Sequence, residues 1–149
     1  MYDKFLLLIT NRFLLAAVLS WLICQTLKFI IGCIKAGRFD LRKLVSSGGM
    51  PSAHTAVFVA PVVMFWCGSI EKDSPILVMM VLAAIIVTYD SVHVRRQCGE
   101  HSKVINRILQ KYKDDDDIKE IKRFKEEGGH TVAQVVVGAI VGAVVGFLL

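Results

Sequence analysis

Two histidines in this sequence each follow a short glycine-containing segment and stand at the beginning of a long apolar stretch. The first segment reads Ser46-Ser-Gly-Gly-Met-Pro-Ser-Ala-His54, and the second reads Gly128-Gly-His-Thr131. Glycines let backbone N–H groups point toward an anion, and a helix N-terminus adds a partial positive charge. Ser52 can cap the first helix and donate to a phosphate oxygen. Gln134 lies one helical turn after the second histidine, where its carbonyl can hold an imidazole N–H. The two segments therefore predict an anion site that contains histidines.

Further ionisable residues lie in or beside the apolar stretches, where each is costly and is a functional candidate by default. Basic side chains predominate, and together with two histidines they fit a phosphate monoester or diester better than a carboxylate metal cage. Lysines and arginines at the ends of spans also act as plain membrane anchors, and that alternative stays open for each one alone. The set comprises Lys28, Lys35, His54, Asp90, His93, Arg95, Arg96 and His130.

The elements that would position these residues are four apolar runs, each close to the 20 or so residues that cross a bilayer as a helix. The chain has 149 residues, is 54% hydrophobic and carries a net charge of +5, with a mean hydropathy of +0.56. This composition excludes a disordered chain and a disulfide scaffold, and it favours a basic membrane face over nucleic-acid binding. We predict one all-α, polytopic membrane domain over residues 1–149, with spans at about 13–34, 52–70, 75–92 and 131–149.

Between the third and fourth spans we predict a polar loop over residues 93–130. Apolar residues at helical spacing in this loop predict two short amphipathic helices at the membrane surface. The first contains Ile105, Ile108 and Leu109, and the second contains Ile118, Ile121 and Phe124. The acidic run 114–117 would be a solvated turn between them.

Lysine and arginine are distributed unevenly between the two sides of this four-span arrangement. The first and third loops together carry fourteen, whereas the opposite side has only Lys4, Arg12 and Lys72. The positive-inside rule makes the richer side, which holds the histidine segments, cytoplasmic.

Small residues recur every fourth position in the last span, at Gly138, Gly142 and Gly146. Such a stripe lets helix backbones approach closely. It predicts tight packing within the monomer or, as the alternative, a homo-oligomer.

The histidine motifs resemble those of a known superfamily. The segment Pro51-Ser-Ala-His54 is similar to the P-S-G-H motif of the type-2 phosphatidic acid phosphatase and vanadium haloperoxidase superfamily. The segment 47–56, Tyr89-Asp-Ser with Val94-Arg-Arg96, and Gly129-His-Thr with Val135 and Gly138 resemble its divergent bacterial and plastid branch. The similarity extends over roughly residues 28–142. It implies a lipid phosphatase of a bacterial cell membrane.

The resemblance also implies roles for the candidate residues. His130 would attack phosphorus to form a phosphohistidine, and His54 would protonate the leaving alcohol and then activate water, with no metal or other cofactor. Lys28 and Lys35 match the spacing of the superfamily's K-x6-R-P motif, although lysine replaces arginine and Ala36 replaces proline. The phosphate-binding groups would be Lys28, Lys35, Ser52, Ala53 and either Arg95 or Arg96.

Three features depart from the superfamily pattern. The superfamily pattern has five residues between an arginine and the nucleophile, a spacing that Arg95 and His101 satisfy literally. We prefer His130 because it begins a span and is followed by a residue that can orient it. That residue is Gln134 where the superfamily has aspartate, and Asp90 is the candidate to supply the missing charge. Four spans are also fewer than the usual six.

The sequence therefore predicts a membrane phosphatase for a lipid phosphate, either phosphatidic acid-like or a polyprenyl phosphate or pyrophosphate. One alternative is a non-catalytic binder or carrier of anionic lipids, which the neutral Gln134 favours. The other is a small transporter subunit that oligomerises through the glycine stripe and relays protons through its histidines.

Overall fold

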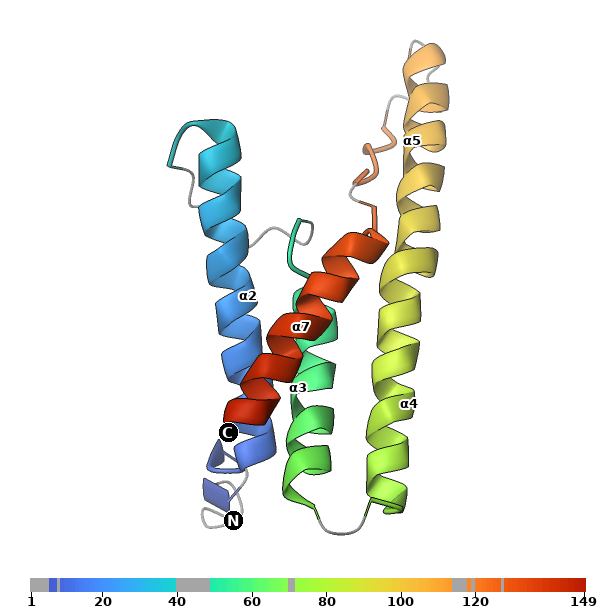
Figure 1. Cartoon of the computed structure of the whole chain (residues 1–149). Helices are drawn as coiled ribbons and strands as arrows, with labels where there is room; N and C mark the ends of the chain where they lie inside the picture. Colours follow the sequence, from blue (N-terminus) through green and yellow to red (C-terminus); the bar gives the residue numbers. More distant parts are fainter. Residues whose placement is uncertain are drawn as a thin grey trace.

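The computed structural model describes residues 6–7, 9–39, 49–69, 72–113, 118, 120–126 and 128–149, and within these ranges the fold is helical without strands (Figure 1). Two helical runs there, α2 and the unbroken Pro75–Lys111, are long and apolar enough to cross a membrane, and two shorter apolar helices accompany them. The prediction of an all-α membrane protein is confirmed. The elements are α2 (Arg12–Ala36), α3 (Ala53–Gly68), α4 (Pro75–Tyr89), the π-helix η2 (Asp90–Val94), α5 (Arg95–Lys111) and α7 (Val132–Leu148).

The sequence fixes the ends of the helices through ordinary capping chemistry. The Asn11 side chain accepts hydrogen bonds from the backbone N–H groups of Phe13 and Leu14 and so begins α2. Gly37 ends that helix in the left-handed conformation, with φ of 61°, a region that glycine enters without steric cost. Pro75 occupies the first turn of α4, where its missing N–H has no partner to lose.

Helix α3 is the centre of the bundle and contacts α2, α4 and α7. The glycine stripe of α7 packs directly on α3, where a Cβ atom built on Gly142 would lie 2.6 Å from the Ala56 carbonyl oxygen. Cβ atoms on Gly138 and Gly146 would collide with the carbonyl oxygens of Ser52 and Ala60. The stripe therefore packs within the monomer, and a homo-oligomer through it would require α7 to leave α3.

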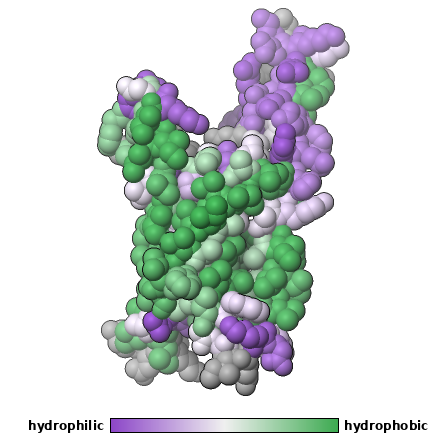
Figure 2. All heavy atoms as spheres, viewed as in Figure 1, coloured by the Kyte–Doolittle hydropathy of each residue, from purple (hydrophilic) through white to green (hydrophobic). Residues whose placement is uncertain are grey.

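Large apolar side chains cover the outside of the bundle, as expected when lipid is the surrounding solvent. Examples are Leu22 on α2, Ile86 on α4 and Val136 on α7, which are 46%, 67% and 51% exposed. Figure 2 shows, on one face of the bundle, a belt of hydrophobic residues with hydrophilic residues gathered at both ends. The belt is the surface that a membrane would cover.

The region between the third and fourth spans differs from the prediction of a loop with two surface helices. No breaker interrupts the chain after residue 92, so α4 runs through η2 directly into α5, which is collinear with it and projects beyond the bundle (Figure 1). The first predicted amphipathic helix is thus the end of one long helix. Residues 121–126 are not helical, because Asn106 of α5 takes both backbone groups of Phe124 as partners. The acidic run 114–117 lies outside the described residues.

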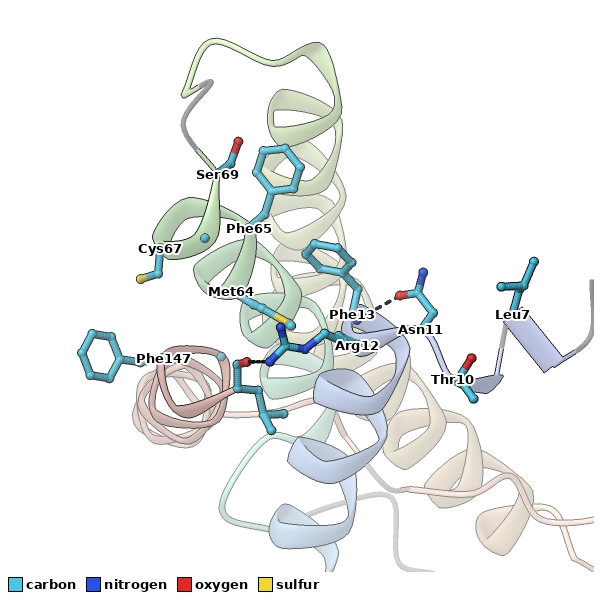
Figure 3. A pocket seen from close by; sticks show the side chains of 13 residues that line it. Leu7, Thr10, Asn11, Arg12, Phe13, Met64, Phe65, Cys67, Ser69 and Phe147 are labelled. Carbon is cyan, nitrogen blue, oxygen red and sulfur yellow. Dashed lines mark hydrogen bonds between the residues drawn. The ribbon is translucent and has the colours of Figure 1, made fainter.

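The N-terminal end of α2 meets the C-terminal ends of α3 and α7. There the Phe13 and Phe65 rings lie 6.0 Å apart, and Arg12 donates to the Leu149 carbonyl oxygen at 2.6 Å. A cavity of about 710 Å³ opens at this end (Figure 3), and its lining includes none of the predicted site residues. From this level α3, with 16 residues, rises only about 24 Å, less than the roughly 30 Å of a hydrocarbon core. Its histidine-bearing end is therefore recessed between the taller α2 and α4–α5.

Candidate active site

The first histidine segment forms the capped N-terminus of α3. Ser52 is fully buried, and its hydroxyl oxygen accepts hydrogen bonds from the Thr55 hydroxyl at 3.0 Å and the Thr55 backbone N–H at 3.3 Å. Its backbone N–H donates to the Gln134 carbonyl oxygen at 2.9 Å, which joins this segment to α7. The N–H groups of Ala53 and His54, the first two of the helix, have no intrahelical acceptor and face the position of an anion at this terminus.

The second histidine segment is held against the π-helix. The His130 backbone N–H donates to the Ser91 carbonyl oxygen at 2.8 Å. A side chain on Gly129 would collide with that same oxygen and would lie 2.8 Å from the Arg96 backbone nitrogen. Single π turns are common at functional sites because they turn backbone groups away from the regular ladder. Here the turn supplies the carbonyl that places His130.

Hydrogen bonding determines which nitrogen of His130 carries the proton. The Thr131 backbone N–H donates to Gln134 Oε1 at 3.1 Å, and Gln134 N–H donates to Thr131 Oγ1 at 3.4 Å, which together form a capping box at the start of α7. Because a backbone N–H can only donate, the atom it meets must be the amide oxygen. The same oxygen lies 2.9 Å from His130 Nδ1, so Nδ1 carries the hydrogen. Nε2 of the neutral ring therefore holds a free lone pair.

His54 and His130 face each other across the recessed end of the bundle. Their ring centroids are 6.0 Å apart with an interplanar angle of 57°. A nucleophile must come within about 3 Å of phosphorus, and an acid within about 3 Å of the leaving oxygen. Rings this close can both contact one phosphoryl group.

Two cations surround the histidine pair. Lys28 of α2 is only 6% exposed, and both it and Arg95 of α5 interact electrostatically with His54 and with His130. Burial lowers the pKa of His130, the Gln134 hydrogen bond acts in the opposite direction, and Lys28 and Arg95 add to the lowering. His130 is thus held neutral in a positively charged site, which suits a nucleophile toward a phosphate dianion.

Comparison with known proteins identifies the family of the chain. A family model described as the divergent PAP2 family matches residues 9–145. The chain belongs to this family. It is also 30% identical, over 154 aligned residues that cover 95% of this chain and 96% of the relative, to a protein of Bacillus subtilis (strain 168) named uncharacterized membrane protein YuiD. No solved structure matches the chain.

Within this member of the divergent PAP2 family, the structure brings together most of the residues predicted for the site. Asp90 binds Arg95, with 2.7 Å between the carboxylate oxygen and Arg95 Nε, and lies within electrostatic range of His54. The residue that contacts the His130 ring is Gln134, as its spacing indicated. The group at the recessed end consists of Lys28, Ser52, Ala53, His54, Asp90, Arg95, His130 and Gln134.

Two predicted phosphate-binding residues lie elsewhere. Lys35 is exposed in the last turn of α2, about 10 Å further along the helix axis than Lys28. Arg96 lines a separate cavity of about 550 Å³ together with His93, Glu100 and His101. Of the two adjacent arginines, Arg95 is the one that interacts with the histidine pair, and His101 faces the other cavity. Within the described ranges, no three His, Cys, Asp or Glu side chains lie close enough to hold a metal ion.

One positioning contact had no sequence signal. Asn106 of α5 is 6% exposed. Its amide donates to the Phe124 carbonyl oxygen at 2.9 Å and to Glu126 at 2.8 Å, and its oxygen accepts from the Phe124 N–H at 2.9 Å. These bonds fix the segment that leads into Gly129 and His130. By contrast, the T-x-x-Q spacing of the capping box was readable in the sequence.

Proposed function

We propose that this protein is a membrane-embedded phosphohydrolase that removes phosphate from a lipid through a phosphohistidine on His130. The observation that carries the proposal is the free Nε2 lone pair of His130, set by the Gln134 hydrogen bond, opposite a second histidine. Membership of the divergent PAP2 family supports a related chemistry.

In the first step, His130 Nε2 would attack phosphorus while the bond from phosphorus to the lipid oxygen breaks. His54, in its protonated form, would give its proton to that oxygen, and the alcohol would leave. In the second step, His54 would take a proton from water, whose oxygen attacks phosphorus as the N–P bond breaks and inorganic phosphate is released. Lys28, Arg95 and the first N–H groups of α3 would stabilise the equatorial oxygens in both steps.

An amphiphilic substrate follows from the depth of the site. The histidines lie at the recessed ends of two short apolar helices, where the head group of a lipid in the bilayer can reach them. Phosphatidic acid-like lipids and polyprenyl phosphates or pyrophosphates both satisfy this condition. The excess of basic residues in the first and third loops supports a multi-pass arrangement with the site on the cytoplasmic face.

The test is phosphate release from a panel of lipid phosphates by the purified chain in mixed micelles. We expect His130→Ala to abolish turnover and His54→Ala to slow it severely, while His101→Ala, which changes a histidine in another cavity, retains activity. Loss of activity in His101→Ala with retention in His130→Ala would overturn the assignment of the nucleophile. A folded wild-type protein that releases no phosphate from any lipid of the panel would overturn the function.

A second function, binding or carrying an anionic lipid without turnover, is favoured by one observation. The partner of the His130 ring is the neutral amide of Gln134, which orients the imidazole but cannot neutralise the cationic ring formed on attack. Incubation with a lipid carrying radiolabelled phosphate separates the two functions. An acid-labile label on His130 is expected of the enzyme, and a binder forms no such adduct.

A further inference from the structure

An apolar groove runs from the histidine site into the membrane region between α3, α4 and α7. Helices α4 and α7 both pack on α3, and the groove lies between them. It encloses about 500 Å³, and apart from threonine hydroxyls, Tyr89 and His93 its lining consists of aliphatic side chains such as Val59, Val81 and Val135. Its volume falls in the range of small-molecule sites.

The upper end of the groove adjoins the phosphate site through residues next to it in sequence. Thr55 lines it and donates to the hydroxyl of Ser52, while Val132, also in the lining, comes two residues after His130. From Thr55 to Val62 along α3, the groove descends seven residues, or about 10 Å. The antiparallel α4 lines the same depth from Thr88 to Val81. The groove therefore begins where the head-group site ends and points toward the membrane interior.

We propose that this groove holds one hydrocarbon chain of the lipid phosphate whose head group reaches His130, an inference that rests on the proposed function. A phosphate held between the histidines leaves its hydrocarbon chain at the upper mouth of the groove, and an aliphatic lining is where that chain loses contact with water and polar groups. The alternative occupant is a helix of a second copy, which would pack across the mouth of the groove. The experiments below separate the two.

Narrowing the groove tests the proposal with a matched pair of substitutions on α4. Val81 lines the groove, whereas Val78, one turn earlier on the same helix and 52% exposed, does not. We expect Val81→Trp to reduce kcat/KM for a long-chain lipid phosphate at least tenfold and to leave a short, water-soluble alkyl phosphate unaffected. Val78→Trp is expected to change neither. If Val81→Trp does not fold, Ala139→Leu narrows the groove from α7.

Photo-crosslinking supplies a readout that does not depend on turnover. A lipid phosphate with a diazirine midway along its chain is bound to the His130→Ala variant and irradiated, and the adducts are mapped by mass spectrometry. We expect adducts on groove residues of α3, α4 and α7. When added to the His130→Ala variant, Val81→Trp should reduce this labelling and Val78→Trp should leave it unchanged. Adducts as frequent on the outward-facing Ile86 as on Val81 would overturn the proposal. The proposal would also be overturned if Val81→Trp disrupted a contact between two copies of the protein and left the labelling by the lipid probe unchanged.

The two proposals fail in different ways. If wild type hydrolyses lipid phosphates and Val81→Trp matches Val78→Trp on long and short substrates, the groove assignment is wrong and the phosphatase stands. If wild type forms no phosphohistidine and releases no phosphate, the phosphatase is wrong, and the photo-adducts alone decide what the groove binds.

Discussion

Replacing Gln134 with glutamate should change the pH dependence of the reaction without disturbing the fold. Glutamate and glutamine are equally suited to the third position of a capping box, so a carboxylate oxygen can take over both hydrogen bonds of Gln134 Oε1, from the Thr131 N–H and from His130 Nδ1. The difference is the charge. A negative partner favours the protonated imidazole and so raises the pKa of His130, which burial lowers in the wild type.

The size of the change follows from the hydrogen bond that becomes charged. A neutral hydrogen bond contributes about 1 kcal/mol and one to a charged group about 1.5–3 kcal/mol, so the imidazolium gains roughly 1–1.5 kcal/mol, or about one pKa unit. In the proposed mechanism His130 is a neutral nucleophile, so activity in wild type should persist as the pH falls below 6.5, the ordinary pKa of histidine. In Gln134→Glu the acid limb should move to higher pH by about one unit. Above both limbs the variant should turn over faster, by up to about tenfold, because the cationic phosphohistidine is stabilised.

The assay is kcat for a lipid phosphate at saturating concentration, at half-unit steps of pH, with Gln110→Glu as the control. Gln110 is exposed on α5, so its replacement makes the same change of net charge away from the site. Ionisation of the substrate's phosphate, with a pKa near 6, affects all three proteins equally and cancels in the comparison. Profiles of wild type and Gln134→Glu that cross support the reasoning. Superimposed profiles would refute it, since protonation of His130 would then not control the acid limb.

Three further substitutions test the parts that position the site. Gly129→Ala should cost about 1–3 kcal/mol of stability through overpacking and should remove most of the activity. Gly128→Ala, whose added Cβ would have its nearest atom 4.0 Å away, should match wild type. Equal effects of the two substitutions would contradict the close packing of Gly129 on the π-helix. Asn106→Ala removes three hydrogen bonds and should lower both the melting temperature and kcat, and unchanged kcat would show that the segment before the nucleophile is placed by other contacts. Lys28→Met should raise KM by about 10–100-fold, which corresponds to the binding free energy of one charge-assisted hydrogen bond. Lys35→Met should leave KM unchanged. A larger effect of Lys35→Met would reverse the assignment of the two lysines.

Hydropathy located the membrane helices because their length and polarity are set by the bilayer. Hydropathy did not predict the helix end correctly where the residues become polar but the helix continues. After residue 92 the sequence becomes charged, and this change was interpreted as the end of the third helix, although nothing in residues 93–111 breaks a helix. The structure continues from α4 to α5 over Pro75–Lys111. An end of hydrophobicity marks the membrane boundary and carries no information about backbone hydrogen bonding.

Within the site, a contact between residues close in sequence could be predicted, whereas contacts between distant residues could not. Gln134 and His130 are four residues apart on one helix turn, so their contact could be predicted from spacing. The choice between Arg95 and Arg96 could not, because the π-helix at residues 90–94 inserts an extra residue and changes which arginine faces the histidines. The contact of Asn106 with Phe124 spans eighteen residues, with part of the intervening chain outside any helix. No local pattern in the sequence specifies it.

A single oxygen, Gln134 Oε1, joins the stability of the fold to the proposed chemistry of the site. This explains how a neutral residue can stand where the superfamily pattern that the sequence resembles has an aspartate. The capping box requires an acceptor at this position, and either an amide or a carboxylate provides it. An amide keeps the tautomer of His130 and adds no negative charge next to the phosphate, so Lys28 and Arg95 act on the substrate undiminished. A carboxylate would stabilise the cationic intermediate and repel the incoming dianion. Gln134→Glu should therefore raise kcat and KM together, and a rise in kcat with unchanged KM would show that the two cations are not directed at the phosphate.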